Sequence, residues 1–237
     1  MRQPHPDRAG NGRLGLIGRD GIPVVVNYRS DAAAAAQVVT AIENSGGRAV
    51  AVRADVADTA QIRLLFDAAA QHFGGAEIVV SNAGSAGFGP LAQGTDAEFD
   101  LMFAANAKST FALLREAANR LPDGGRIVVI SSGVTHTHRP GSGLYGAAKA
   151  AGEHLVRVLA RELAPREITV NSVLPGAVRT EAPAASGIAG QLDRIAESIP
   201  LGRLGEPEDI ADIVAFLTSR DARWITGAAV PAGGGAF

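Results

Sequence analysis

The sequence predicts an α/β protein, a doubly wound parallel sheet with helices on both faces. Short runs of β-branched residues alternate along the chain with longer segments of helical periodicity, and glycine pairs close two of those segments. The chain has 237 residues, of which 46% are hydrophobic and 19% charged. This is enough apolar material for one large core, so we expect residues 1–237 to form a single domain.

Five segments have the composition of buried strands. They are residues 24–27, 49–54, 77–81, 126–131 and 168–174. Consecutive strands separated by a helix are joined by crossover connections, which place the strands parallel to one another. The spacing therefore predicts a parallel sheet.

Two of the intervening helices carry both start and stop signals. One runs from Asp31 to Ser45 before Gly46-Gly47, and the other from Asp58 to Phe73 before Gly74-Gly75. An aspartate at the first position accepts hydrogen bonds from the exposed N-H groups of the first turn, and glycine readily adopts the left-handed conformation that ends a helix.

Composition excludes several classes of function. The net charge of -2 and the absence of a basic cluster predict no nucleic-acid partner and no binding to an anionic membrane. Without cysteine, and with five scattered histidines, the chain predicts no metal site. No apolar run is long enough to span a bilayer and residues 1–10 lack a secretory signal, so we expect a cytoplasmic protein.

The candidate catalytic residues are Ser132, Tyr145 and Lys149. Tyr145 and Lys149 are four residues apart in a segment of helical periodicity, so they lie on one face. A phenol titrates near pH ~10, and a nearby cation lowers its pKa by roughly 1 to 3 units, which suits acid/base chemistry. Ser132 follows the strand-like run "RIVVIS", where open α/β sheets bind ligands, and its hydroxyl would hold a substrate oxygen.

Other interpretations remain for these residues. A Tyr-x-x-x-Lys pair also occurs on ordinary amphipathic helices. A hydrolase using Ser132 is opposed by the absence of a Gly-x-Ser-x-Gly elbow. His136 and His138, between Ser132 and Tyr145, either are solvated loop residues or line the mouth of a substrate site.

From Val24 onward the chain resembles the short-chain dehydrogenase/reductase family. The resemblance rests on "NAG" at residues 82–84, "ADV" at 54–56, "NSVLPGAVRT" at 171–180 and the Ser132, Tyr145 and Lys149 constellation. Two C-terminal segments, "PLGRLGEPEDIADIVAFLTS" and "WITGAAVPAGGG", are similar to the 3-oxoacyl-carrier-protein reductase branch.

The resemblance implies a Rossmann-like fold, hydride transfer from a nicotinamide to a carbonyl, and roles for named residues. Tyr145 would be the acid/base, Ser132 would orient the carbonyl oxygen, Lys149 would hold the nicotinamide ribose, and Asn106 would join a proton relay through a water. The implied cofactor contacts are Tyr28, Arg29, Ser30, Asp55, Val56, Asn82, Ala83, Gly84, Tyr145, Lys149, Pro175, Gly176, Val178 and Thr180.

The residues after the first recognisable strand favour NADP(H) over NAD(H). An acidic side chain there binds the ribose hydroxyl of NAD, whereas a basic one accommodates the additional phosphate of NADP. Arg29 and Ser30 occupy these positions, and no carboxylate occurs before Asp31, which we interpret as a helix cap.

Residues 1–23 form an atypical head. Relatives would open with a strand and a glycine-rich turn, whose three glycines align near Pro4, Arg8 and Gly10. The prolines predict that residues 1–9 cannot form the central strand, so the first strand is absent or altered. A Gly-x-Gly-x-x-Gly pattern does occur at Gly10, Gly12 and Gly15, but no strand precedes it, and Gly18, Gly21 and Pro23 oppose a helix after it, which disfavours a working phosphate loop.

Two functions remain open at this point. One is an NADP(H)-dependent reductase of a ketone or 3-oxoacyl substrate, with the segment Glu181–Pro200 as a lid over an uncharged or partly apolar ligand. The other is a non-catalytic relative that serves as a binding or assembly subunit because the head impairs cofactor binding. The resemblance also implies a homo-oligomer, a tetramer or a dimer, formed through the helices that carry Asn106 and Tyr145 and through the C-terminal strand.

Overall fold

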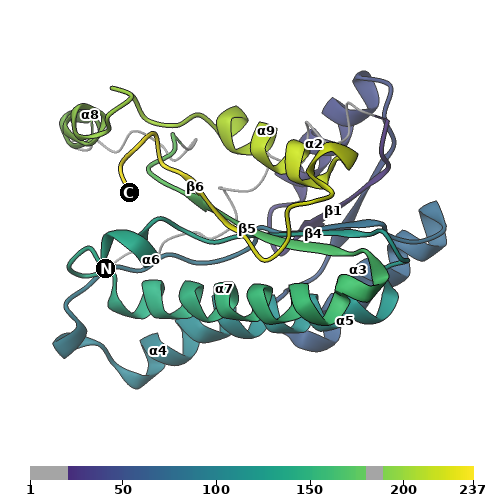
Figure 1. The fold of residues 1–237 in the computed structure, drawn as a ribbon, viewed down its shortest axis with the longest axis horizontal. Coiled ribbons are helices and arrows are strands. Elements are labelled where there is room, and N and C mark those ends of the chain that lie inside the picture. The colour runs from purple at the N-terminus through teal and green to yellow at the C-terminus, as the bar shows by residue number, and fades with distance from the viewer. Residues whose placement is uncertain (1–20, 180–188) are drawn as a thin grey trace.

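The computed structural model describes residues 21–179 and 189–237 (Figure 1). All five predicted strands are present, and a sixth follows near the C-terminus. The strands are β1 (Val24–Tyr28), β2 (Ala49–Arg53), β3 (Ile78–Ser81), β4 (Arg126–Ile130), β5 (Thr169–Pro175) and β6 (Ala229–Ala232). The strand predictions are therefore confirmed to within a few residues at each end.

Helices fill most of the connections between the strands. They are α2 (Ala32–Asn44), α3 (Thr59–Phe73), α4 (Asp96–Phe103), the π-helical turn η2 (Ala104–Lys108), α5 (Ser109–Arg120), α6 (Val134–Thr137), α7 (Gly143–Leu163), α8 (Ala189–Ser198) and α9 (Pro207–Thr218). The described residues also form three short 3-10 turns, η1 (Leu91–Gln93), η3 (Ala164–Arg166) and η4 (Arg220–Ala222).

The predicted capping aspartates occupy the positions expected of them. The side chain of Asp31 accepts a hydrogen bond from Ala34 N at 2.8 Å, and that of Asp58 accepts one from Ala60 N at 3.0 Å. Gly74 ends α3 in the left-handed conformation, with φ of 83°. These caps confirm the helix boundaries predicted from the sequence.

The strands are parallel within two groups. One sheet has the order β3-β4-β5-β6, and β1 pairs with β2. Within residues 21–179 and 189–237, no ladder joins β1 to β3. The altered first strand, which would lie between them, was predicted for residues that lie outside the described part of the chain.

Helices cover both faces of the sheet (Figure 1). Helices α3, α5 and α7 pack on one face, while α2 and α9 pack on the other. Strands β4 and β5 supply residues to both cores, since Ile127 packs with α5 and α7 whereas Val128 packs with α9. Alternate side chains of a strand point to opposite faces, and a doubly covered strand is therefore apolar throughout.

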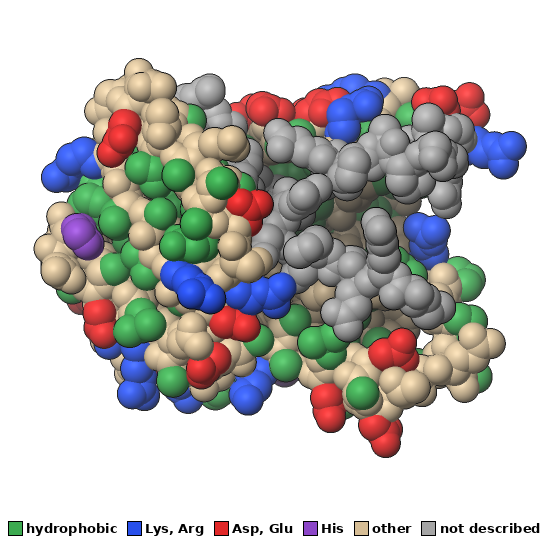
Figure 2. All heavy atoms as spheres, turned by 180° about the vertical axis from the view of Figure 1, so that it is seen from behind, with side chains coloured by type: hydrophobic (Ala, Val, Ile, Leu, Met, Phe, Trp, Pro, Cys, Tyr) green, Lys and Arg blue, Asp and Glu red, His purple; other side chains and the backbone are tan. Residues whose placement is uncertain are grey.

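The surface carries charges of both signs. On the face shown in Figure 2, the Lys and Arg side chains are interspersed with Asp and Glu rather than gathered by sign. No helix in the described ranges combines the length and the apolar character needed to cross a bilayer. The same residues contain no group of three histidine or acidic side chains arranged to hold a metal ion.

Candidate active site

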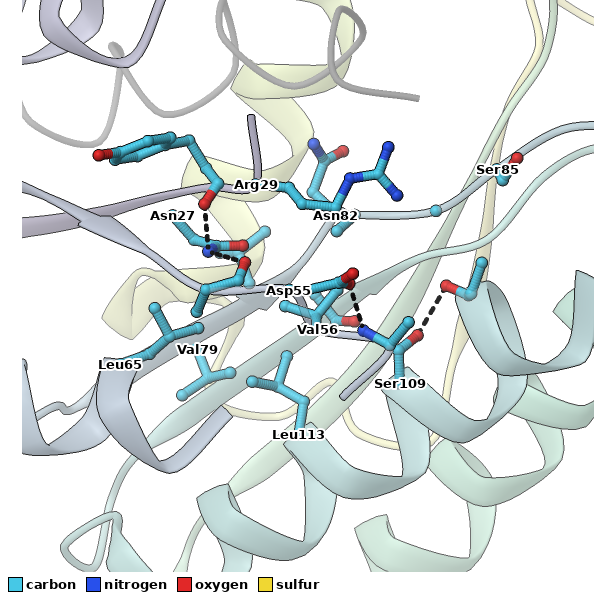
Figure 3. Close-up of a pocket in the computed structure, with 18 of the residues that line it drawn as sticks. Asn27, Arg29, Asp55, Val56, Leu65, Val79, Asn82, Ser85, Ser109 and Leu113 are labelled. Atoms are coloured by element: carbon cyan, nitrogen blue, oxygen red, sulfur yellow. Dashed lines mark hydrogen bonds between the residues drawn. The ribbon is translucent and has the colours of Figure 1, made fainter. Parts of the chain in front are cut away.

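A cavity of about 1980 Å³ runs along the gap between β1 and β3, from the amino ends of these strands at Val24 and Ile78 to the loops that follow β1, β2 and β3. Figure 3 shows Arg29, Asp55 and Asn82 among its polar lining, and Leu65, Val79 and Leu113 among its apolar lining. The cavity extends between β1 and β3, where Val25 and Val79 line it. Ligands of open α/β sheets bind at the carboxyl ends of the strands, where the strand order reverses.

Seven of the predicted cofactor residues line this cavity. They are Tyr28, Arg29, Asp55, Val56, Asn82, Ala83 and Gly84. The described lining does not include Ser30, Tyr145, Lys149, Pro175, Gly176 or Val178, and Thr180 lies outside the described residues. The half-buried Val178 instead packs against the core formed by β4, β5 and α9.

Lys149 lies between the strand ends and the turn after β3. Its Nζ donates a hydrogen bond to Ile130 O at 2.9 Å, and the residue is only 8% exposed. A Cβ placed on Gly84 would lie 3.1 Å from this Nζ and 2.6 Å from Asn106 Oδ1. The bare Cα of Gly84 is what lets the "NAG" turn approach both side chains.

Asn106 sits in the π-helical turn η2, where sequence reasoning expected an ordinary helix. Its Nδ2 donates to Met102 O at 2.9 Å, and Ser109 Oγ donates to Ala105 O at 2.7 Å. Side chains that bond to the carbonyl four residues earlier compete with the helix's own N-H groups, which favours the wider turn. Asn106 Nδ2 also donates to Ser85 O at 2.9 Å, while its Oδ1 accepts from Ser85 N at 3.2 Å.

Tyr145 occupies the first turn of α7, close to Lys149. The Lys149 ammonium lies 6.0 Å from the centroid of the Tyr145 ring. The ring of Phe88 meets that of Tyr145 edge-on, with centroids 5.8 Å apart, and the Arg139 guanidinium lies 5.6 Å from the centroid of Phe88. Tyr145 is half-buried, and its ring neighbour Phe88 lines the cavity.

Ser132 lies on the short connection between β4 and α6. Its Oγ accepts a hydrogen bond from Val134 N at 3.4 Å, and its side chain is partly exposed. The preceding residue, Ser131, is buried and donates to Glu153 Oε1 at 2.5 Å, while Gly133 N donates to Pro175 O at 2.8 Å. The serine loop is thus held by both α7 and the end of β5.

Comparison with known proteins identifies the family. A model of the enoyl-(acyl carrier protein) reductase family matches residues 16–236. An uncharacterized oxidoreductase of Methylorubrum extorquens is 44% identical over 222 residues, which cover 92% of this chain and 89% of that protein. The chain belongs to the short-chain dehydrogenase/reductase family.

Named relatives and solved structures of this family are also similar. The versicolorin reductase stcU of Emericella nidulans is 38% identical over 233 residues, which cover 93% of this chain and 88% of that protein. The angucycline C-6 ketoreductase LanV, solved with bound NADP, has a TM-score of 0.91 at 38% identity, covering 98% of this chain and 92% of its own. LugOII is a promiscuous reductase that catalyses keto-reduction at C1 during lugdunomycin biosynthesis. It has a TM-score of 0.90 at 36% identity, and the match covers 98% of this chain and 94% of LugOII.

Sequence reasoning missed three residues that hold or contact parts of the candidate active site. Ser85 holds Asn106 through its backbone, Phe88 contacts Tyr145, and Glu153 holds Ser131. Glu153 carried a signal, because it lies four residues after Lys149 on the same face of α7. The contacts of Ser85 and Phe88 depend on loop geometry, for which the sequence has no periodic signal.

The expected lid contains a helix. Residues 181–188 of the predicted segment lie outside the described part, but Ala189–Ser198 form α8. After α8, Ile199 and Leu201 pack against Gly234 near the C-terminus. The end of this segment is therefore anchored to the tail of the chain.

Proposed function

We propose that this protein is an NADP(H)-dependent reductase that converts a ketone to a secondary alcohol. The observation that carries the proposal is the position of Lys149, whose Nζ is bonded to the end of β4, lies beside the Tyr145 ring, and reaches the Gly84 turn. The Lys149 ammonium thus lies close to the strand that precedes Ser132, to the ring of Tyr145 and to the cavity wall at Gly84. The similarity to reductases that act on ketones supports the same reaction.

The chain's residues fit a dinucleotide carrying the additional phosphate. The cavity offers the Arg29 guanidinium as an anion-binding donor, Asn82 as a polar contact, and the bare Cα of Gly84 for close approach. Asp31, the first carboxylate after β1, is occupied as the cap of α2, so it does not select a ribose hydroxyl. When bound there, NADPH supplies the hydride.

The proton chemistry belongs to the protein. Tyr145 gives its phenolic proton to the carbonyl oxygen as the carbonyl carbon accepts hydride, and the Lys149 ammonium stabilises the resulting phenolate. The Ser132 hydroxyl donates a hydrogen bond that orients the same oxygen. Asn106, held by Ser85 and Met102, orients the relay that returns a proton to Tyr145.

The substrate end of the site favours an apolar ketone. Phe88 and Leu91 line the cavity with exposures of 60% and 68%, and Leu144 precedes Tyr145 in the same lining. Exposed apolar side chains beside a polar reaction centre are typical of sites that bind the hydrocarbon part of a ligand. We therefore infer an uncharged ketone with an aromatic or alicyclic body.

The protein acts as a homo-oligomer in this proposal, with a second copy covering the face made by α4, η2 and α5. Phe99 and Phe111 are exposed there. A groove of about 610 Å³ beside them is lined largely by apolar side chains, including Phe103, Ala107 and Leu155. A contiguous apolar surface of this kind favours association.

The proposal is tested with the full-length protein, NADPH and two probe ketones, α-tetralone and ethyl acetoacetate. We expect saturable NADPH binding, weaker NADH binding, and faster reduction of α-tetralone. Tyr145→Phe removes the proton donor and should lower kcat by about 100-fold or more with nearly unchanged NADPH affinity. Absence of NADPH binding by the folded protein would instead support the non-catalytic alternative, which the comparisons do not favour.

A further inference from the structure

The side chain of Phe237, at the C-terminus, lies against the loop that carries Ser132. Strand β6 pairs in parallel with β5, and Gly176 N donates to Ala232 O at 3.0 Å. Beyond β6 the chain turns, with Ala236 N donating to Gly233 O at 3.1 Å, and Phe237 reaches the start of α6. Figure 1 shows the C-terminus on the side of the sheet end where α6 lies.

The ring of Phe237 packs between two glycines. A Cβ on Gly133 would lie 2.2 Å from Cε1 and 2.4 Å from Cζ of this ring, and a Cβ on Gly233 would lie 2.3 Å from the same Cε1. Neither glycine has a positive φ, so both positions tolerate other residues on backbone grounds. The ring fits between these two residues because neither has a side chain.

Gly133 is otherwise held by its peptide groups. Its N-H donates to Pro175 O at 2.8 Å, and its carbonyl accepts from His136 N at 3.0 Å and from Thr137 N at 2.9 Å. The Phe237 ring covers the Cα of Gly133, which is buried. The centroid of the His136 ring lies 6.1 Å from that of the Phe237 ring. The residue next to Ser132 is thus held by hydrogen bonds along its backbone and by an aromatic ring on its open face.

We infer that Phe237 is a positioning residue for Ser132. Its ring presses on Gly133 and so keeps the Ser132 hydroxyl where it meets the carbonyl oxygen. This inference rests on the proposed role of Ser132. Removing the ring leaves space over Gly133, the loop gains freedom, and the hydroxyl spends less time in the productive position, which lowers kcat.

The experiment compares Phe237→Ala, Phe237→Leu and Gly133→Ala in the full chain, with NADPH and α-tetralone. Phe237→Ala should lower kcat by about tenfold with unchanged NADPH affinity. Phe237→Leu should lower kcat less, because leucine fills part of the space over Gly133. Gly133→Ala should have a similar effect, since its methyl group displaces the ring. The kcat of the double variant Gly133→Ala/Phe237→Ala should be no lower than that of either single variant, because the methyl group at position 133 then occupies the space that the Phe237 ring has left.

Controls separate positioning from general damage. Trp224→Ala removes an aromatic ring that is 96% exposed, and should leave kcat, assembly and thermal stability unchanged. Thermal unfolding and molecular mass in solution are recorded for every variant, so that kinetics are compared only among folded proteins of the same assembly. Phe237→Leu keeps an apolar side chain in place if the alanine variant fails to fold.

Three outcomes would overturn the inference. They are a Phe237→Ala kcat within twofold of the parent, losses that multiply in the double variant, or a loss of NADPH affinity that parallels the loss of kcat. Ser132→Ala tests the underlying role separately. If Ser132→Ala retains full activity, the role of Ser132 fails; if it abolishes activity while Phe237→Ala does not, only the inference on Phe237 fails.

Discussion

The Ser131 hydroxyl donates a hydrogen bond of 2.5 Å to the carboxylate of Glu153, which is 3% exposed. Glu153 also faces Arg157 at 3.4 Å on the same helix. Together with the bond from Lys149 to Ile130 O, this contact ties the end of β4 to α7 just before Ser132. The helix that carries the proposed acid/base therefore also fixes the strand that carries the proposed oxygen-binding serine.

Replacing Glu153 tests this connection. Glu153→Ala leaves the buried Ser131 hydroxyl without its acceptor and should destabilise the fold by about 1 to 3 kcal/mol. Glu153→Gln retains an amide oxygen as acceptor and should cost clearly less. Urea unfolding followed by circular dichroism measures both, and equal losses in the two variants would contradict the role of the hydrogen bond.

The close approach of Gly84 to Asn106 and Lys149 predicts a steric effect. Gly84→Ala places a methyl group 2.6 Å from Asn106 Oδ1 and 3.1 Å from Lys149 Nζ, and both of these side chains are buried. We expect lower thermal stability and weaker NADPH binding by calorimetry.

Gly152→Ala is the matched control for Gly84→Ala. Its Cβ would meet Thr110 only at the ordinary distance of 3.5 Å, and its helical position favours alanine. Equal effects of the two substitutions would argue against crowding at Gly84.

Arg29 is expected to set the cofactor preference. Arg29→Ala removes the cation that we assign to the additional phosphate, and should weaken NADPH binding by about tenfold while leaving NADH binding unchanged. Fluorescence titration with both cofactors measures the ratio. Arg53→Ala, which removes the neighbouring guanidinium bonded to Arg29 O, controls for a general loss of charge. A parallel loss of NADH affinity would contradict a phosphate-specific contact.

Phe111 is expected to lie in the contact between two copies. Phe111 is 46% exposed and lines the same groove as Phe103 and Leu155, so Phe111→Glu should place a charge in the interface and dissociate the oligomer. Light scattering after gel filtration gives the mass. Leu64→Glu on α3, at 49% exposure, is the control and should retain the parent mass.

Asp209 predicts a dependence of stability on pH. Its carboxylate accepts hydrogen bonds from Arg203 Nη1 at 2.6 Å and Nη2 at 2.8 Å, and from Glu206 N at 2.7 Å. The Arg203 hydrogen bonds, followed by that from Glu206 N, lower the pKa of Asp209 to about 2. Because the folded pKa lies below that of the unfolded chain, the contribution is complete above about pH 4 and is lost as pH falls toward 2.

Asp209→Asn should therefore lower the free energy of unfolding at pH 6 by about 1 kcal/mol, a value reduced by solvent screening of this partly exposed pair. The difference between parent and variant should shrink at pH 3. Thermal unfolding at the two pH values measures it, and a difference that stays constant would exclude the carboxylate as its source.

Sequence reasoning located the strands and the caps, and it placed Tyr145 and Lys149 on one helix, because each of these features depends on local chemistry. The β-branched run of Arg126–Ile130 favours a strand wherever it lies, Asp58 caps the helix that follows it, and the spacing of Tyr145 and Lys149 places them on one helical face. These features need no knowledge of distant residues.

Only the tertiary structure decided which distant residues meet. Asn106, Gly84 and Lys149 come from three separate segments, and Asn106 is held in the π-helical turn by the backbone of Ser85, twenty-one residues earlier. Phe237 is the last residue of the chain, yet its ring lies on Gly133, more than a hundred residues earlier. Such contacts depend on how the layers pack and on where space is left, and no local propensity or periodicity encodes them.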